Sequence, residues 1–329
     1  MNADKALRAF FSFKKNLHSG LLPACFLAIM GLLTGCGSKT DSTIAINGVS
    51  TLYIVDTESN TVLWSKSYDG TYRMRCVSDG DTVYLGTEDG ILHALSMESG
   101  EELWQTQASH NFDFRGDMDI VDGVLYYTAI YSRETGNWPV CSLDLETMEE
   151  IPLSTGTTTM GNFSIYQGQL YTCTESGVSV YDMTTGETVT WDLPDPICQY
   201  RAVWNDIYVA GYSSGRMEWY TIDESGLTRY RTLNYDELSM PGKVREGTEV
   251  IEANDEAAVL LEQCEMSDED TGFYVYLTET EELVSYDRVS AWAWPSYIYF
   301  ADHGFYALWQ DELRYYDYNG SWEILASGS

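Results

Sequence analysis

The sequence predicts an all-β protein built from repeated units of short strands. The unit is clearest in Gly80–Gln107, where three runs of alternating apolar and polar residues are separated by turns at Glu88–Gly90 and Glu98–Gly100 and end on Trp104. A meander of this size cannot bury its apolar face alone, so further copies or a second sheet must cover it. Composition favours the same class, because the 329 residues include 25 Tyr, 10 Trp and 10 Phe but only 7 Pro.

Further copies of the unit follow at a regular interval. The third strands of the copies end at Asp56, Ser96, Asp144, Asp182, Asp223, Thr278 and Asp317. These ends are 40, 48, 38, 41, 55 and 39 residues apart, and the two long intervals contain the polar insertions Ser132–Pro139 and Cys264–Thr271. A period near 40 residues with four short strands per unit is typical of a β-propeller.

We therefore predict a single propeller domain of four-stranded blades over residues 43–329, with seven blades. Six blades are the alternative, because only Thr43–Ile46 precedes the clear strands of the first copy. The ring is expected to close by an exchange of strands.

The repeat resembles that of a known family. Tyr53–Trp64, Gly90–Trp104 and Val180–Trp191 each contain an apolar strand, a turn and a strand that closes on Trp, as in quinoprotein-like propellers with PQQ-like repeats. The resemblance implies that Trp64, Trp104 and Trp191 are structural clasps, which pack between neighbouring blades while the indole N–H binds a backbone partner. The other copies depart from the pattern and carry Ile151, Tyr230 and Val284 or Tyr286 near this place.

The N-terminus reads as a targeting segment. Lys5, Arg8, Lys14 and Lys15 precede the apolar run Leu21–Leu33, which is the order of a secretory signal. Leu33–Cys36 resembles a bacterial lipobox, and this implies a signal peptide over residues 1–35, lipidation of Cys36 and a flexible tether over residues 36–42.

This resemblance implies an extracytoplasmic protein anchored to a bacterial membrane through Cys36, on the inner membrane, the outer membrane or a Gram-positive surface. In anchor and fold, the chain is similar to the propeller lipoprotein of outer-membrane assembly.

Charge and cysteine content restrict the partners and the covalent chemistry. Residues 36–329 carry 14 basic and 50 acidic residues, a net charge of −36, so nucleic-acid binding is excluded. Cys76, Cys141, Cys173, Cys198 and Cys264 follow the lipobox at scattered spacings. They are interpreted as small apolar core residues, with one disulfide as the alternative.

No motif points to catalysis or to a cofactor. A quinone-dependent dehydrogenase of the resembled family would need an adjacent cysteine pair, a calcium site and a much longer chain. His93, His110 and His303 have no neighbour at metal-ligand spacing, and the acidic loops Asp117–Gly123 and Asp268–Gly272 are interpreted as solvated turns. We therefore expect no catalytic residue, no metal and no cofactor.

One set of residues predicts a binding site. Counting ten or eleven residues onward from each clasp position reaches the innermost strands at Arg75, Arg115, Asn162, Arg201 and Trp294. With the nearby aromatic and basic residues Tyr72, Arg73, Phe112, Tyr200 and Trp292, the arginines would form a site for carboxylates at one mouth of the central channel. The other interpretation is that the arginines neutralise acidic loops.

The predicted function is that of a binding or scaffolding module for protein or peptide partners at the cell envelope. The alternative is an envelope hydrolase or lyase that acts on a saccharide or peptide in the channel. An enzyme should place two or more carboxylates or a His in the channel, whereas a scaffold should show Arg and aromatic side chains there.

Overall fold

The fold is described from a computed structural model, in which residues Thr43–Ser329 form one unit. The described residues are 42–48, 50–68, 74–113, 116–130, 138–153, 162–195, 198, 200–212, 214–238, 248–262, 272–286, 289, 295–309 and 312–327. Within these ranges, no helix is long and apolar enough to cross a membrane.

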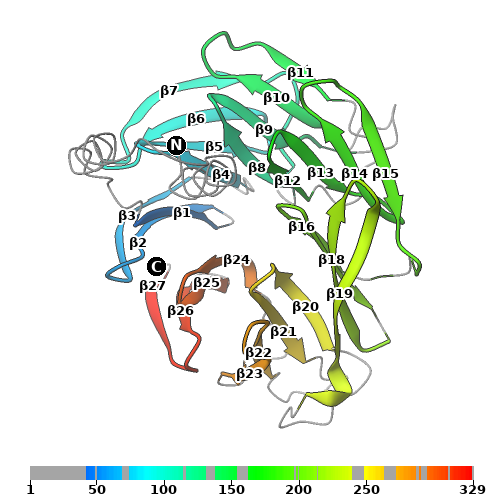
Figure 1. The fold of residues 1–329 in the computed structure, drawn as a ribbon. Coiled ribbons are helices and arrows are strands. Elements are labelled where there is room, and N and C mark those ends of the chain that lie inside the picture. The colour runs from blue at the N-terminus through cyan, green and yellow to red at the C-terminus, as the bar shows by residue number, and fades with distance from the viewer. Residues whose placement is uncertain are drawn as a thin grey trace, which may run out of the picture. The chain divides into compact units, whose positions relative to one another are not determined.

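The strands form seven antiparallel sheets arranged as the blades of a ring (Figure 1). Blade 1 has three strands, β1 (Thr43–Asn47), β2 (Thr51–Asp56) and β3 (Thr61–Ser67). The other six blades have four strands each, and the seven-bladed prediction is confirmed.

The strands of blades 2 to 4 are β4 (Met74–Asp79), β5 (Thr82–Thr87), β6 (Ile91–Ser96), β7 (Glu102–Gln107), β8 (Met118–Val121), β9 (Val124–Thr128), β10 (Val140–Asp144), β11 (Glu150–Pro152), β12 (Phe163–Tyr166), β13 (Gln169–Cys173), β14 (Gly177–Asp182) and β15 (Thr188–Asp192). Those of blades 5 to 7 are β16 (Tyr200–Trp204), β17 (Ile207–Tyr212), β18 (Arg216–Asp223), β19 (Gly226–Asn234), β20 (Thr248–Ala253), β21 (Ala257–Glu262), β22 (Phe273–Leu277), β23 (Glu282–Ser285), β24 (Pro295–Ala301), β25 (Gly304–Trp309), β26 (Glu312–Asp317) and β27 (Trp322–Ser327). A single 3-10 turn, η1 (Tyr235–Glu237), follows β19.

The burial pattern along a strand reflects its place in the blade. In β25, a middle strand, all six residues are buried because blades cover both faces of the sheet. In β3, an outermost strand, exposed and half-buried residues alternate, as expected where one face meets solvent. Each of the seven interfaces between neighbouring blades holds one cluster of buried apolar side chains.

The turn after the third strand recurs because an aspartate stabilises it. Oδ1 of Asp56 accepts hydrogen bonds from the backbone N–H groups of Glu58 and Ser59, and Asp144 and Asp182 bind the equivalent N–H groups in their own turns. Such hydrogen bonds between a side chain and nearby backbone N–H groups stabilise a turn where strand pairing would otherwise continue.

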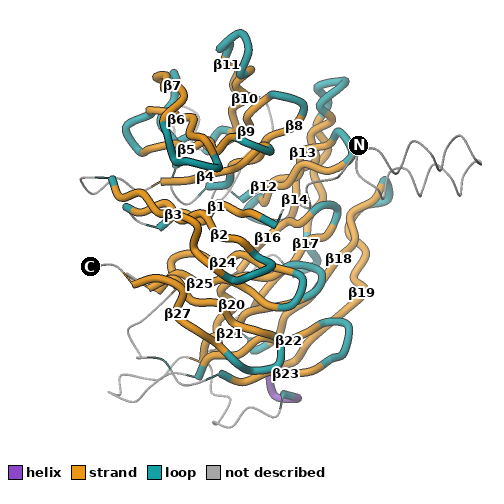
Figure 2. Tube along the Cα trace, turned by 90° about the vertical axis from the view of Figure 1, so that its left-hand side faces the viewer, coloured by secondary structure: helices purple, strands orange, loops and turns teal. Residues whose placement is uncertain are grey.

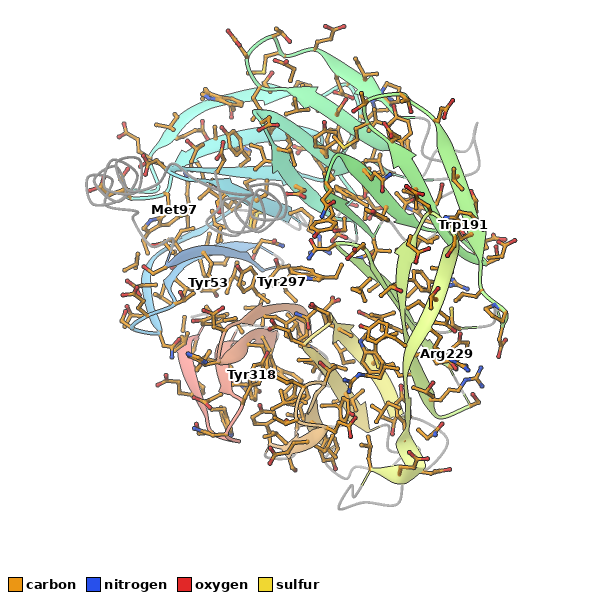
Figure 3. The ribbon with its side chains drawn as sticks, in the orientation of Figure 1. Tyr53, Met97, Trp191, Arg229, Tyr297 and Tyr318 are labelled. Carbon is orange, nitrogen blue, oxygen red and sulfur yellow. The ribbon has the colours of Figure 1, made fainter. Side chains whose placement is uncertain are left out.

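Aromatic residues on the outermost strands contact the next blade. Trp64 Nε1 donates to the Met97 carbonyl at 2.8 Å, and its ring packs over Gly100. The ring of Trp191, at the rim of the propeller (Figure 3), packs over Gly226 in the same way. In blade 6, where the Trp is absent, the Tyr286 hydroxyl donates to the Asp317 carbonyl at 2.9 Å.

Within the described residues no strand is exchanged between blade 1 and blade 7, and the exchange expected from the sequence stays a prediction. β1 pairs with β2 in the register that β5 has with β6, with Thr43 opposite Asp56 as Thr82 is opposite Ser96. Blade 1 therefore lacks the innermost strand of the other blades over these residues, and β1 to β3 lie beside β24 to β27 (Figures 1 and 2).

Side chains hold this seam together. Ile44, Ile46 and Val55 of blade 1 pack against Tyr306, Leu308 and Leu313 of blade 7. The Tyr306 hydroxyl donates to Asn60 Oδ1 at 2.7 Å.

Candidate functional site

The candidate site is the centre of the ring, where the inner strands of the blades meet (Figure 1), and we call this region the channel. Five blades place a polar residue at the same position near the start of the inner strand. Arg75 pairs with Gly86, Tyr200 with Gly211 and Tyr297 with Leu308. Asp117 and Asn162 stand directly before β8 and β12, and their carbonyls accept from Thr128 and Cys173 of the next strand.

These side chains link each blade to the next through hydrogen bonds. Asp117 Oδ2 accepts from Asn162 Nδ2 at 2.8 Å and from the Phe163 N–H at 3.0 Å. Asn162 Oδ1 accepts in turn from the Val203 N–H at 2.9 Å.

The same pattern continues into blade 6. The Tyr200 hydroxyl donates to Glu252 Oε1 at 2.8 Å and accepts from the Ala253 N–H at 2.8 Å. Most of these polar side chains on the inner strands therefore form hydrogen bonds with backbone groups of the inner strand in the next blade.

Arg75 differs from the rest of this wall. Its guanidinium carbon lies 5.5 Å from the centroid of the Tyr297 ring, so a cation from blade 2 meets an aromatic ring from blade 7. The Nε atom of Arg75 is buried and has no hydrogen-bond partner among the described residues. A guanidinium group binds carboxylate oxygens with paired hydrogen bonds.

Two carboxyl groups in the channel bind protons more tightly than usual. Burial, together with the negative charge of Asp117, raises the pKa of Glu252 to about 7, against the hydrogen bond from Tyr200 and the charge of Arg75, which lower it. Burial also raises the pKa of Asp117, although Arg75 and the Phe163 N–H oppose the shift.

Some of the predicted binding residues lie in this channel and others do not. Arg75 and Tyr200 belong to it. Arg201, the next residue along β16, donates from Nη2 to the Glu175 carbonyl of blade 4 at 2.8 Å. Phe112 is 2% exposed in the core between blades 2 and 3, against Gly86 and Tyr127, and so does not face the channel. The other predicted positions lie outside the described residues: Cys36, Tyr72, Arg73, Arg115, Trp292 and Trp294.

Sequence reasoning missed Asp117, Glu252 and Tyr297. Counting from the clasp position reached Arg115 in blade 3 and Trp294 in blade 7, two and three residues before the positions that the pairing assigns to Asp117 and Tyr297. β20 and β24 each contain a register shift, so a fixed count cannot locate their side chains. The sequence contained one signal for this site, Asp117, but the interpretation of Asp117–Gly123 as a solvated turn left it out.

One group of described residues away from these positions could hold a metal ion. His110, Cys141 and Glu150 have ligand atoms that all lie within 4.8 Å of one another. Cys76, Cys141, Cys173 and Cys198 are free thiols, and Cys141 and Cys173 are buried, in agreement with their interpretation as core residues.

Comparisons with solved structures show the fold. The computationally designed Ika8 protein has 13% identity, with 88% of this chain and 85% of that chain covered and a TM-score of 0.53. The β-propeller domain of Cps50 (Swd1) from Myceliophteria thermophila has 10% identity, with coverage of 88% and 94% and a TM-score of 0.53. BamB from Moraxella catarrhalis matches with 17% identity, coverage of 67% and 64% and a TM-score of 0.41.

A search of curated proteins finds no match. The family model described as outer membrane protein assembly factor BamB matches residues 27–225, a range that ends in blade 5. Since this is more than half of the chain, the chain belongs to the PQQ-like propeller family of the outer membrane protein assembly factor BamB.

Proposed function

We propose that this protein is a lipid-anchored, extracytoplasmic propeller that binds or scaffolds protein or peptide partners at the cell envelope. The observation that carries the proposal is membership of a family whose model is described as an assembly factor for outer membrane proteins. A factor that assembles other proteins has to bind them, and a propeller is a rigid platform on which to do so.

The channel is the proposed contact for an acidic group of the partner. Arg75 combines a buried N–H that has no partner among the described residues with an aromatic ring at 5.5 Å. Arginine and tyrosine are enriched among residues that dominate binding energy, and guanidinium binds carboxylate with paired hydrogen bonds. A side-chain or terminal carboxylate of a peptide would satisfy Arg75.

The first test is crosslinking in intact cells with wild-type protein, Arg75→Gln and a control, Arg229→Gln. Arg229 lies on the outermost strand of blade 5 (Figure 3), with 57% of its side chain exposed. We expect a specific crosslinked partner for wild type and Arg229→Gln and its loss for Arg75→Gln. Equal crosslinking by a folded Arg75→Gln protein would rule out the channel contact.

The second test addresses the anchor. Cys36→Ser removes the only atom that a lipobox can lipidate, so fatty-acid labelling should disappear and the protein should leave the membrane fraction. Persistent labelling would show that Cys36 is not the lipidated residue.

A second candidate function rests on Asp117 and Glu252, two channel carboxyls with raised pKa values. A protonated and an ionised carboxyl in one channel are what a hydrolase or lyase for an envelope saccharide or peptide would need. Asp117, however, is already bound by Asn162 and the Phe163 N–H. Turnover of envelope fragments by wild type that is lost in Glu252→Gln would support the enzyme over the scaffold.

A further inference from the structure

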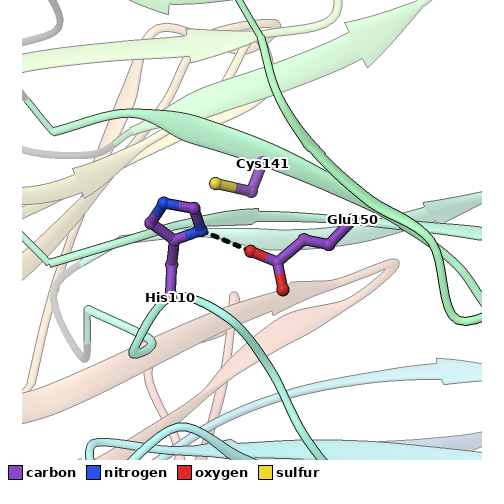
Figure 4. Close-up of side chains that lie close together, drawn as sticks. All are labelled: His110, Cys141 and Glu150. Carbon is purple, nitrogen blue, oxygen red and sulfur yellow. Dashed lines mark hydrogen bonds and ion pairs between the residues drawn. The ribbon is translucent and has the colours of Figure 1, made fainter.

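A second cluster of reactive side chains lies between blades 2 and 3 (Figure 4). Cys141 is the second residue of β10, and Glu150 begins β11 opposite Leu143. Residues two apart on a strand share a face, so Cys141 and Glu150 lie on the side of the sheet that carries Leu143. That side packs into the core shared with blade 2.

The third member, His110, comes from the connection between β7 and β8. This connection is held on both sides of His110, because the Ala108 N–H donates to the Gly90 carbonyl at 2.9 Å and Phe112 forms a bridge with Ala129. Glu150 holds it as well, since one carboxylate oxygen accepts the Ser109 N–H at 2.6 Å and the other is hydrogen-bonded to His110 Nδ1. The three side chains are therefore brought together by the fold and not by sequence spacing.

We propose that His110, Cys141 and Glu150 form a three-ligand site for one divalent transition-metal ion, with zinc as the best match and a fourth position open to water. One imidazole nitrogen, one sulfur and one carboxylate oxygen are ligands that zinc accepts together, and three protein ligands leave room for a water molecule. This site is independent of the proposed channel contact.

The geometry fits a preorganised site. The three ligand atoms lie within 4.8 Å of one another, whereas ligand atoms around a tetrahedral zinc are roughly 3.3–3.8 Å apart by its bond lengths, so modest side-chain rotations complete it. The His110 side chain is 44% exposed while that of Glu150 is 5% exposed, so the ion has an entry path on the histidine side.

Metal binding requires Cys141 as the thiolate. On binding, the Cys141 proton would pass to solvent, a metal–sulfur bond would form, and the ion would replace the hydrogen bond between His110 and Glu150. No redox step is involved.

An internal control exists in blade 2. His93 Nδ1 is hydrogen-bonded to Glu102 Oε2 at 2.9 Å, so the histidine–carboxylate pair is repeated there. No cysteine joins this pair among the groups of described residues that could hold a metal. If a histidine and a carboxylate were sufficient for metal binding, the ion would bind at both histidine–carboxylate pairs.

The test is titration of chelator-treated full-length protein with Co²⁺, followed by absorption spectroscopy. We expect one equivalent of Co²⁺ to give a thiolate-to-cobalt band in the near ultraviolet, which Zn²⁺ then removes. Cys141→Ser should abolish the band, and His110→Ala should weaken binding at least as much as the about 10–100-fold typical of lost outer-shell partners. His93→Ala and Cys173→Ser should behave as wild type.

A thermal measurement keeps the test independent of spectroscopy. Zn²⁺ should raise the melting temperature of wild type and of His93→Ala, each compared with its own zinc-free protein, but not that of His110→Ala. The proposal is wrong if no thiolate band forms, or if the band survives in Cys141→Ser. Weak Co²⁺ binding without that band would show only the general affinity of an acidic surface.

Discussion

At the scale of single residues, Glu252 shows how the ring changes the chemistry of a side chain. Its carboxyl is enclosed by the inner strands, where burial and Asp117 disfavour its negative charge and Tyr200 and Arg75 favour it. Burial dominates, so the folded protein holds a proton on Glu252 up to a pH of about 7.

This shift predicts that stability falls as the pH rises through the interval between the unfolded and folded pKa values. The pKa of an unfolded glutamate is about 4.3. Between this value and about pH 7 the folded state binds more protons than the unfolded state, so the free energy of unfolding falls as the pH rises and stops falling above about pH 7. Glu252→Gln, which keeps an acceptor for Tyr200, should gain about 1–3 kcal/mol of unfolding free energy at pH 8 and almost none at pH 4. Urea unfolding at both values checks this, and an equal effect at both would contradict it.

At the scale of strands and turns, the contact between an outermost aromatic residue and the next blade is the recurring element. Trp64 and Tyr286 use different side chains to reach the same place, the backbone just after the third strand of the following blade. Gly100 belongs to this contact, because its φ of 69° suits glycine and a Cβ there would lie 3.1 Å from the Trp64 ring.

Gly100→Ala should therefore destabilise more than the matched Gly80→Ala. Gly80 has a similar φ of 58° but nothing within 4 Å of an added Cβ, so it reports the backbone strain alone. We expect about 1 kcal/mol for Gly80→Ala and an additional about 1–2 kcal/mol for Gly100→Ala from displacement of the indole. Chemical denaturation of both variants measures the difference, and equal losses would mean that Trp64 moves freely.

At the scale of the whole molecule, the seam around blade 1 is the place where the ring depends most on side chains. Asn47, 6% exposed at the end of β1, donates from Nδ2 to the Met74 carbonyl at 2.7 Å and accepts from the Cys76 N–H at 3.3 Å. Asn47 lies on the strand that occupies the second position in blade 1, and its side chain forms hydrogen bonds with the backbone of blade 2.

Asn47→Ala should destabilise the whole propeller because it leaves backbone groups of β4 without these partners. Each unsatisfied buried group costs about 1–3 kcal/mol, so we expect a loss of about 2–4 kcal/mol in a single cooperative transition. Asn319→Ala, at an exposed turn of blade 7, is the control and should cost less than about 1 kcal/mol. Similar losses in both variants would show that Asn47 does not hold the seam.

The sequence by itself determined the repeat and the class of fold, and it favoured seven blades over six. These features follow from local patterns, namely the period near 40 residues, the strand alternation and the aspartate turns. Such patterns specify hydrogen bonding and burial within one stretch of chain. The same holds for the Trp64 contact, because it depends on a motif that spans one turn and one strand.

Only the tertiary structure decided which side chains meet. Asp117, Glu252 and Tyr297 come together with Arg75 through the closure of the ring and through register shifts in β20 and β24, which sequence counting cannot place. His110 and Glu150 are 40 residues apart and are joined by the packing of blade 2 on blade 3. The contacts of blade 1 with its two neighbours have the same cause, because Asn47 bonds to the backbone of blade 2 and Tyr306 of blade 7 bonds to Asn60. Contacts of this kind depend on long-range packing, which a repeat pattern does not record.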